Sequence, residues 1–333
     1  MVHQVKVSII IPVFNVETFL RQCLESVIHQ TLTELEIICI NDGSTDQSLH
    51  ILEEYAAKDN RIIILDKENG GQGLARNLAM QRATGEYVGF VDGDDWINPN
   101  MFFSLYTSAK QYDADVTICE FQLFNTAKGL IPQTEWFKLP IHKKFDHIAF
   151  RWADISEVGF HLNSGPVNKL FKNDFIRQHT FTFATDLYYE DIPFVFPSLI
   201  RADKISLVRA PFYFYRYSRP GSTTADKGKR QFEIFEILQI LQTNIEHFPG
   251  HEKIRMLFYA YKFNQLFFHC REIDTTYKVE FWENLKTEFN KLDSESRKCL
   301  RMHAFLIKLG RKRGCQFFKV VKYLERLRFQ VVK

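Results

Sequence analysis

The stretch Tyr87-Val-Gly-Phe-Val-Asp92-Gly-Asp94-Asp95-Trp96 joins an apolar run directly to three carboxylates. The apolar run, residues 87–91, predicts a strand buried on both faces of a parallel sheet. Three like charges at a strand end repel one another and resist desolvation, and a cation bridging them to a phosphate would offset this cost. Mg2+ and Mn2+ take such oxygen ligands, usually one or two carboxylates with phosphates and water. The alternative is a solvated turn, because Asp and Gly are common turn residues.

Strand and helix patterns alternate on the N-terminal side of this stretch. Apolar and β-branched residues run through 5–14, 35–40 and 61–66, and each run predicts a buried strand. Between these runs, apolar side chains recur at helical spacing, for example Val16, Phe19, Leu20, Cys23, Leu24 and Val27. The alternation predicts an α/β fold with a mostly parallel, Rossmann-like sheet and helices on both faces.

Polar segments follow the four predicted strands, at residues 12–15, 41–46, 68–73 and 92–95. In open sheets of parallel strands, ligands bind outside the carboxyl ends of the strands. The four loops therefore predict one binding site along a single edge of the sheet.

The remainder of the chain has weaker patterns. Strands are predicted over 114–121, 205–208 and 211–217, whereas residues 124–150 have no clear periodicity. Residues 230–290 have a helical apolar pattern rich in aromatic residues. We therefore expect a first domain at 1–225, a helical packing subdomain at 226–296 and a basic amphipathic tail at 297–333.

Composition and charge limit the class of protein. With 45% hydrophobic and 25% charged residues, the chain is of the globular type. Its six cysteines have no paired spacing, which supports neither a disulfide framework nor a zinc site. The first strand begins too early for a signal peptide, and no apolar run approaches the roughly 18 residues of a membrane span. We expect a cytoplasmic protein.

Three segments occur in a fixed order: Ser8-Ile-Ile-Ile-Pro-Val-Phe-Asn15, Asn41-Asp-Gly-Ser-Thr-Asp46 and Asp92-x-Asp94. Together they closely resemble glycosyltransferase family 2, whose members have the GT-A fold and use nucleotide-sugar donors. The resemblance covers residues 5–125, weakens toward 225 and is absent from the C-terminal third. It implies that residues 1–225 form a GT-A catalytic domain of the type that builds bacterial surface glycans, such as lipopolysaccharide or capsule.

The resemblance also implies roles on the donor side. Asp42 would bind the base, usually uracil in this family, and Arg76 would lie by the pyrophosphate. Asp94 would bind Mn2+ or Mg2+, Asp92 would lie near the ribose and sugar and is a second candidate metal ligand, and Asp95 is left unassigned. The alternatives are helix capping for Asp42 and a surface position for Arg76. The expected donor-binding residues are Pro12, Phe14, Glu17, Asp42, Arg76, Asp92, Gly93 and Asp94.

Sugar transfer needs a base, because an acceptor hydroxyl attacks poorly until a group within hydrogen-bond reach takes its proton. The pair Glu190-Asp191 resembles the family's acidic motif under the acceptor site. We expect Asp191 to be the base, with Glu190 as its helper, while the metal acts as a Lewis acid on the departing nucleoside diphosphate. One in-line displacement would invert the anomeric centre. The alternative for the pair is two acids favoured by the dipole at a helix N-terminus.

Three further residues match the family less closely. Lys169, in Asn168-Lys-Leu-Phe, is expected either to be structural or to reach the acceptor, and both alternatives stay open. Arg216 and Ser222 lie in a segment that resembles the family's loop over the donor diphosphate. The chain lacks the Gln-x-x-Arg-Trp motif and the membrane helices of processive relatives, which favours the addition of one sugar or a few.

The C-terminal segment, residues 297–333, holds 12 Lys or Arg and one acid, so its net charge is +11 and that of the rest is −8. Apolar residues between Phe317 and Leu327 recur at helical spacing among basic ones, which fits a helix on an anionic membrane. The alternative is a helix packed on the body with a solvated cationic face. Nucleic acid is not an expected partner, because no motif supports it and the body is acidic. We expect residues 300–333 to hold the protein on the inner face of the cytoplasmic membrane, where it would use a glycan or lipid-linked glycan acceptor.

Other functions stay open. A sugar-1-phosphate nucleotidyltransferase has a related sheet but needs a glycine-rich phosphate loop after the first strand, where this chain has Pro12-Val-Phe-Asn15. A dinucleotide oxidoreductase is suggested by Gly70-Gly71-x-Gly73, but these glycines follow the third strand and lack the required spacing, so this function is set aside. A non-catalytic sugar-nucleotide-binding protein is disfavoured by the intact Asp92, Asp94 and Asp191.

Overall fold

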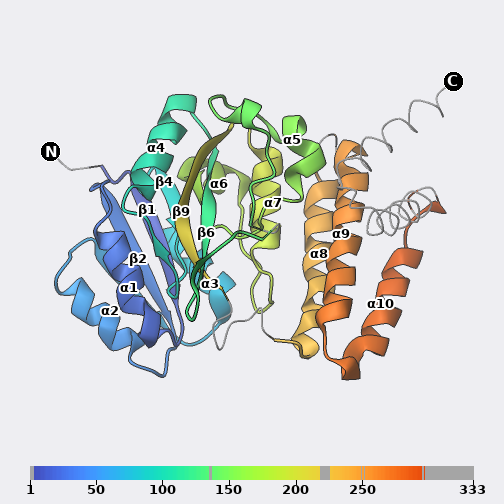
Figure 1. The fold of residues 1–333 in the computed structure, drawn as a ribbon, viewed down its shortest axis with the longest axis horizontal. Helices are drawn as coiled ribbons and strands as arrows, with labels where there is room; N and C mark the ends of the chain where they lie inside the picture. Colours follow the sequence, from blue (N-terminus) through green and yellow to red (C-terminus); the bar gives the residue numbers. More distant parts are fainter. Residues whose placement is uncertain are drawn as a thin grey trace. The chain divides into compact units, whose positions relative to one another are not determined.

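The structure is a computed structural model that describes residues 4–134, 137–217, 226–248, 250, 252–294 and 296. The chain divides into two compact units, residues 1–225 and 226–333 (Figure 1). The predictions made for Ser222 and for the basic segment 297–333 lie outside the described residues. No helix among the residues that are described has the length and apolar content needed to cross a bilayer.

The first half of the N-terminal unit alternates strands and helices as the sequence predicts. Its elements are β1 (Val7–Val13), α1 (Glu17–Ile28), β2 (Leu35–Asp42), α2 (Ser48–Ala56), β3 (Ile62–Lys67), α3 (Gly71–Arg82) and β4 (Tyr87–Phe90). The four strands run parallel in the order β3-β2-β1-β4. Every residue of β1, β2 and β4 is buried, which explains why these strands read as continuous apolar runs. The carboxyl ends of the four strands lie at one edge of the sheet, as predicted.

The second half extends the same sheet. Its elements are β5 (Trp96–Ile97), α4 (Met101–Tyr112), β6 (Val116–Asn125), β7 (Gly129–Ile131), a short 3-10 helix (Lys143–Phe145), α5 (Trp152–Gly159), β8 (Lys169–Lys172), α6 (Asn173–His179), α7 (Ile192–Arg201) and β9 (Ile205–Arg216). Within the described residues the strand order is β3-β2-β1-β4-β8-β6-β9-β5, with β7 paired to β6. Strand β8 runs antiparallel to both of its neighbours, β4 and β6. The sheet is therefore mixed where it leaves the Rossmann-like half.

The strands predicted at 205–208 and 211–217 are one strand, β9, so the predicted break between them is wrong. Strand β9 pairs in parallel with β6 along its whole length, but the register shifts on either side of Glu120. At this irregularity Glu120 lies opposite Pro211, which has no N–H to donate to a ladder. After the shift, Tyr213 lies opposite Phe121 and Arg216 lies opposite Phe124.

Phenylalanine rings join the parallel half of the sheet to the segment that carries the predicted acid pair. The Phe90 ring on β4 makes edge-to-face contacts with Phe171 on β8, Phe183, and Phe194 on α7, at centroid distances of 6.0, 5.3 and 5.8 Å. Phe183 and Phe194 stack at 4.1 Å. Because such ring pairs add stability beyond the area they bury, they hold the start of α7 against the end of β4.

The second unit is helical, as the pattern over residues 230–290 predicts. It contains α8 (Glu233–Glu246), α9 (Glu252–Glu272) and α10 (Lys278–Asn290), with short 3-10 turns at Lys229–Phe232 and Thr275–Tyr277. Phe281 of α10 packs between Phe232 and Phe235 at ring distances of 5.1 and 4.8 Å. The buried Lys262 ammonium forms an ion pair with Glu288 at 2.9 Å within the same unit. This unit therefore has its own aromatic core, and its buried cation is paired internally.

Candidate active site

The loops after β1 and β2 are held together by side-chain hydrogen bonds. Asn15 accepts the N–H of Thr45 at 2.8 Å, and the Glu17 carboxylate accepts the N–H of Gln47 at 2.8 Å. Phe14 follows β1 with 48% of its surface exposed, whereas Pro12 is buried within the strand. The structure therefore brings the predicted residues Phe14 and Glu17 to the strand-end edge, with one exposed ring and one exposed acid.

Asp42 is the last residue of β2, and its side chain is almost fully buried. The carboxylate forms an ion pair with Lys67, at the end of β3, and accepts the N–H of Gly70 at 2.9 Å. It does not cap α2: the N–H of Ser48, the first residue of that helix, is bound by Asp46 at 2.9 Å. Asp42 instead ties the ends of β2 and β3 to the start of α3.

The loop after β4 is fixed from two sides. Asp92 accepts hydrogen bonds from Arg76 at 2.8 Å and Gln72 at 3.0 Å, and burial raises its pKa against the opposing effect of Arg76. Gly93 lies against β1, since a Cβ there would be 3.2 Å from the Pro12 carbonyl oxygen. The loop that carries Asp92 and Asp94 therefore packs directly on the strand-end edge.

Asp95, which the sequence left unassigned, belongs to the internal framework of this loop. Its side chain is 1% exposed and accepts the Tyr213 hydroxyl at 2.8 Å and the N–H of Arg216 at 2.7 Å. The Tyr213 hydroxyl also accepts the N–H of Asp92 at 3.1 Å. Burial raises the pKa of Asp95 well above its usual range, and the Asp94 charge acts in the same direction. Strand β9 thus holds both ends of the carboxylate loop through one tyrosine.

Arg216, predicted to contact the diphosphate, lies beneath the same loop. Its Nε donates to the backbone oxygen of Asp94 at 2.8 Å, and a terminal nitrogen donates to Gln22 at 2.8 Å. The guanidinium is 4.5 Å from the ring centroid of Phe19 and 4.8 Å from that of Trp96. Because the side chain is packed between rings, it supports the loop backbone.

Arg76 joins the donor loop to the acid pair. Its two terminal nitrogens donate to Asp92 at 2.8 Å and to Glu190 at 2.6 Å, residues that are far apart in sequence. The side chain is 2% exposed, so the surface alternative for this residue is wrong, and its Nε has no hydrogen-bond partner among the residues described. Gly73 permits α3 to approach the segment that carries Ala184, since a Cβ on Gly73 would lie 1.9 Å from the carbonyl oxygen of Ala184.

Asp191 immediately precedes α7, and its carboxylate makes no capping hydrogen bond to that helix. It accepts the Ser164 hydroxyl at 3.5 Å. Burial raises the pKa of Asp191 to about 7, and the neighbouring Glu190 charge acts in the same direction. A carboxyl with these properties is suited to accept a proton near neutral pH.

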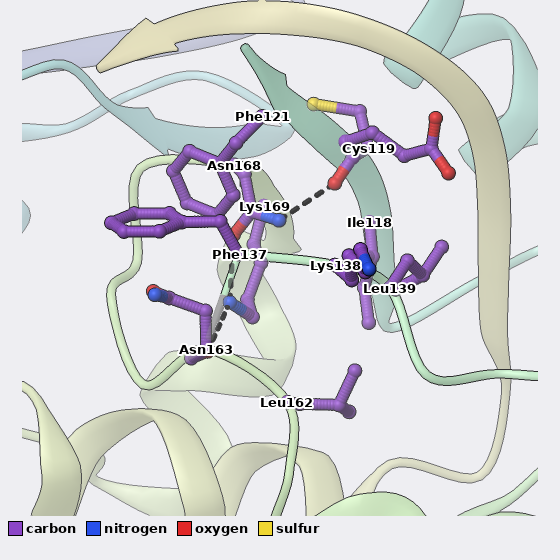
Figure 2. Close-up of a pocket in the computed structure, with 11 residues that line it drawn as sticks. Ile118, Cys119, Phe121, Phe137, Lys138, Leu139, Leu162, Asn163, Asn168 and Lys169 are labelled. Atoms are coloured by element: carbon purple, nitrogen blue, oxygen red, sulfur yellow. Dashed lines mark hydrogen bonds between the residues drawn. The ribbon is translucent and has the colours of Figure 1, made fainter. Parts of the chain in front are cut away.

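Lys169 lies at the start of β8, beside a small cavity (Figure 2). Its side chain is 1% exposed, and its ammonium donates to the carbonyl oxygens of Asn163 and Gly165 and to the side chain of Asn168, at 2.9, 2.7 and 2.8 Å. Burial lowers the pKa of Lys169 to about 7, and the charge of Asp191 opposes this effect. Of the two alternatives for Lys169, this geometry favours the structural one.

A family model described as Glycosyl transferase family 2 matches residues 8–171. The uncharacterized glycosyltransferase EpsJ of Bacillus subtilis is 32% identical over 233 residues, which are 66% of this chain and 62% of that protein. The poly(ribitol-phosphate) beta-glucosyltransferase of Bacillus spizizenii is 34% identical over 224 residues, which are 65% of this chain and 33% of that protein. The chain belongs to glycosyltransferase family 2.

Comparison with solved structures bears on the fold. Residues 1–349 of S. aureus TarS, solved in complex with UDP-GlcNAc, match this family 2 glycosyltransferase with a TM-score of 0.69 at 23% identity, over 84% of this chain and 79% of that one. The predicted family and the predicted GT-A fold are therefore confirmed. The chain spans less than two thirds of the length of EpsJ and of the Bacillus spizizenii enzyme.

The donor set of the glycosyltransferase suits a hard divalent cation. Asp92 and Asp94 are partly exposed carboxylates at the strand-end edge. In the part of the chain that is described, no three His, Cys, Asp or Glu side chains converge on one point. Mg2+ and Mn2+ often bind through one or two carboxylates and take their other ligands from phosphates and water, so the residues present fit such an ion.

Proposed function

We propose that this family 2 glycosyltransferase moves a sugar from a nucleoside diphosphate, with UDP as the first candidate, to an acceptor hydroxyl with inversion. The observation that carries the proposal is the Arg76 bridge between Asp92 and Glu190. It joins the acidic loop after β4 to the acid pair before α7 in one buried ion-paired cluster. The presence of UDP-GlcNAc in the TarS structure supports UDP as the nucleotide.

The donor would lie across the ends of β1, β2 and β4. The exposed Phe14 ring and the buried Asp42 carboxylate offer an apolar face and an acceptor for the imide N–H of uracil. Asp94 and Asp92 would hold Mn2+ or Mg2+, which supplies positive charge for the departing diphosphate. The hydrogen bonds of Asp95 and Arg216 would keep these two carboxylates aligned.

Asp191 would act as the base. The acceptor oxygen would form a bond to the anomeric carbon while the bond from that carbon to the diphosphate oxygen breaks, and the hydroxyl proton would pass to Asp191. Glu190 would keep its ion pair with Arg76, at 2.6 Å. A single displacement of this kind needs no covalent intermediate on the enzyme.

A donor panel tests this function without knowledge of the acceptor. The purified chain is incubated with Mn2+ and with UDP-glucose, UDP-galactose, UDP-N-acetylglucosamine and GDP-mannose, and release of free nucleotide is measured with water as the acceptor. We expect UDP release from at least one UDP-sugar. Release of pyrophosphate from UTP and a sugar 1-phosphate, with no UDP release, would instead support the nucleotidyltransferase.

The acceptor and the location form a separate part of the proposal. We propose a glycan or lipid-linked glycan acceptor and attachment of residues 300–333 to the anionic inner face of the cytoplasmic membrane, from the charge and spacing of that segment. A chain ending at residue 299 should lose binding to vesicles that contain anionic lipid, whereas the full chain should bind them. Equal binding of both would leave the segment without this role.

A further inference from the structure

Lys169 is a fully buried cation bound only to neutral oxygens in the described part of the structure. Figure 2 shows its ammonium directed at the segment that carries Asn163, and each of its three N–H groups has an oxygen acceptor. Removing an ammonium from water costs several kcal/mol, which only well-placed partners offset. If this position needed only packing, an apolar residue would fill it at a lower cost in desolvation free energy.

The bound oxygens identify what the ammonium holds. Two of them are the backbone carbonyls of Asn163 and Gly165, which flank Ser164 on both sides. The third belongs to Asn168, whose side-chain amide donates to the Cys119 carbonyl of β6 at 2.6 Å. Lys169 therefore fastens the segment 163–165 to the sheet, on both sides of one serine.

That serine faces the proposed base. The Ser164 hydroxyl lies 3.5 Å from Oδ2 of Asp191. The charged groups that act on Asp191 are Glu190 beside it, Arg76 from α3, Lys169 from β8 and Asp92 after β4. Lys169 and Arg76 favour the ionised carboxylate, whereas Glu190 and Asp92 oppose it.

We propose that Lys169 is a positioning residue that holds segment 163–165 so that the Ser164 hydroxyl and the Asp191 carboxylate together bind the attacking hydroxyl. The inference rests on the proposed function and adds Ser164 as an acceptor contact for a sugar or polyol hydroxyl. Ser164 can donate its hydroxyl hydrogen to the incoming oxygen, while the proton of the incoming hydroxyl points toward Asp191. Ser164 has no distinguishing signal in the sequence, because Ser and Gly are common in loops.

The variants Lys169→Met and Ser164→Ala test this inference, with Lys172→Met as the matched control. Met keeps the apolar length of lysine, and the cavity beside Lys169, of about 10 Å³, has room for at most about one water in place of the ammonium. Lys172 lies on the same strand, partly exposed and paired with Asp113 at 2.9 Å. The assay is hydrolysis of the UDP-sugar that the donor panel selects, with Mn2+, between pH 5.5 and 9, together with UDP binding by calorimetry.

We expect Lys169→Met to lower kcat by roughly 10- to 100-fold, because small displacements of reacting groups are costly. The acid limb of its pH profile should move to higher pH, because the ionised Asp191 has lost a favourable cation. Ser164→Ala should lower kcat by roughly 2- to 10-fold, the worth of one hydrogen bond. Both should bind UDP as the parent does, and Lys172→Met should match the parent in every measurement.

The inference is overturned if Lys169→Met keeps the kcat of the parent, or if it loses UDP binding in proportion to kcat, as a merely structural role would cause. If Lys169→Met does not fold, Ser164→Ala decides, and unchanged kcat would overturn the inference. Failure of the proposed function would look different from failure of this inference. Asp191→Asn would then keep full activity, whatever the activity of Lys169→Met.

Discussion

The site has two carboxylate clusters, residues 92–95 after β4 and residues 190–191 before α7, and they are held in different ways. Asp92 and Asp95 accept hydrogen bonds of 2.7–3.0 Å from Arg76, Gln72, Tyr213 and the Arg216 backbone. Asp191 accepts a longer bond of 3.5 Å from Ser164, and burial raises its pKa to about 7. Burial raises the pKa of Asp92 and Asp95 as well, so the clusters differ in their hydrogen bonds: the first is a framework with several close donors, whereas the second holds a carboxyl with one long bond.

The difference fits the two chemical tasks that we propose for these clusters. A carboxylate that holds a cation must keep its position, and close donors hold it in place. A carboxylate that takes a proton must have a pKa close to the working pH, and desolvation supplies this. Arg76 contacts both clusters, so the framework and the base are coupled through one buried guanidinium.

The largest effect is expected at the base. Asp191→Asn keeps the size of the side chain but cannot accept the proton, so turnover of the UDP-sugar should fall by roughly 10²- to 10⁴-fold. UDP binding, measured by calorimetry, should be unchanged. Asp174→Asn, an exposed aspartate on α6, is the matched control and should behave as the parent. An equal loss of UDP binding in Asp191→Asn would remove the distinction between the two clusters.

The pH dependence of turnover should follow the ionisation of Asp191. Because the pKa of Asp191 is raised to about 7, the base is increasingly protonated below that pH. The value of kcat/KM should therefore approach a tenfold fall per pH unit below about pH 7, or roughly 50-fold between pH 7 and pH 5. A profile that stays flat to pH 5 would mean that Asp191 has an ordinary carboxyl pKa or is not the base.

Asp94→Ala tests the framework cluster. Removing a metal ligand should weaken Mn2+-dependent UDP binding by at least the roughly 10- to 100-fold that loss of an outer partner costs. Mn2+ binding can be followed by electron paramagnetic resonance, with Asp174→Ala as the control. Unchanged Mn2+ affinity would refute Asp94 as a ligand.

A smaller effect is expected for Arg216→Met. The variant loses the donor to the Asp94 backbone but keeps a long side chain between the aromatic rings. Mn2+ affinity should fall about tenfold, at the low end of the range for outer partners, while the acid limb of the pH profile stays in place. A shift of the acid limb would show that the two clusters are coupled more widely than through Arg76.

Much of the framework cluster can be predicted from local sequence. An apolar strand that ends at Asp92, together with the rule that ligands bind at strand ends, places the loop without any long-range information. The bracing by Tyr213 cannot be predicted in this way, because that residue is far away in sequence and its register depends on the irregularity in β9. The same limit applies to Ser164, whose contact with Asp191 joins two segments that are far apart in sequence.

The dual hydrogen bond of the Tyr213 hydroxyl has a thermodynamic consequence. The phenol joins the Asp92 backbone to the Asp95 carboxylate through groups of the chain itself. The conformational entropy of the loop is therefore lost when the chain folds, and donor binding does not have to repeat that loss. A chain with Phe at this position would bind its donor with a less favourable entropy, even if every ligand contact were kept.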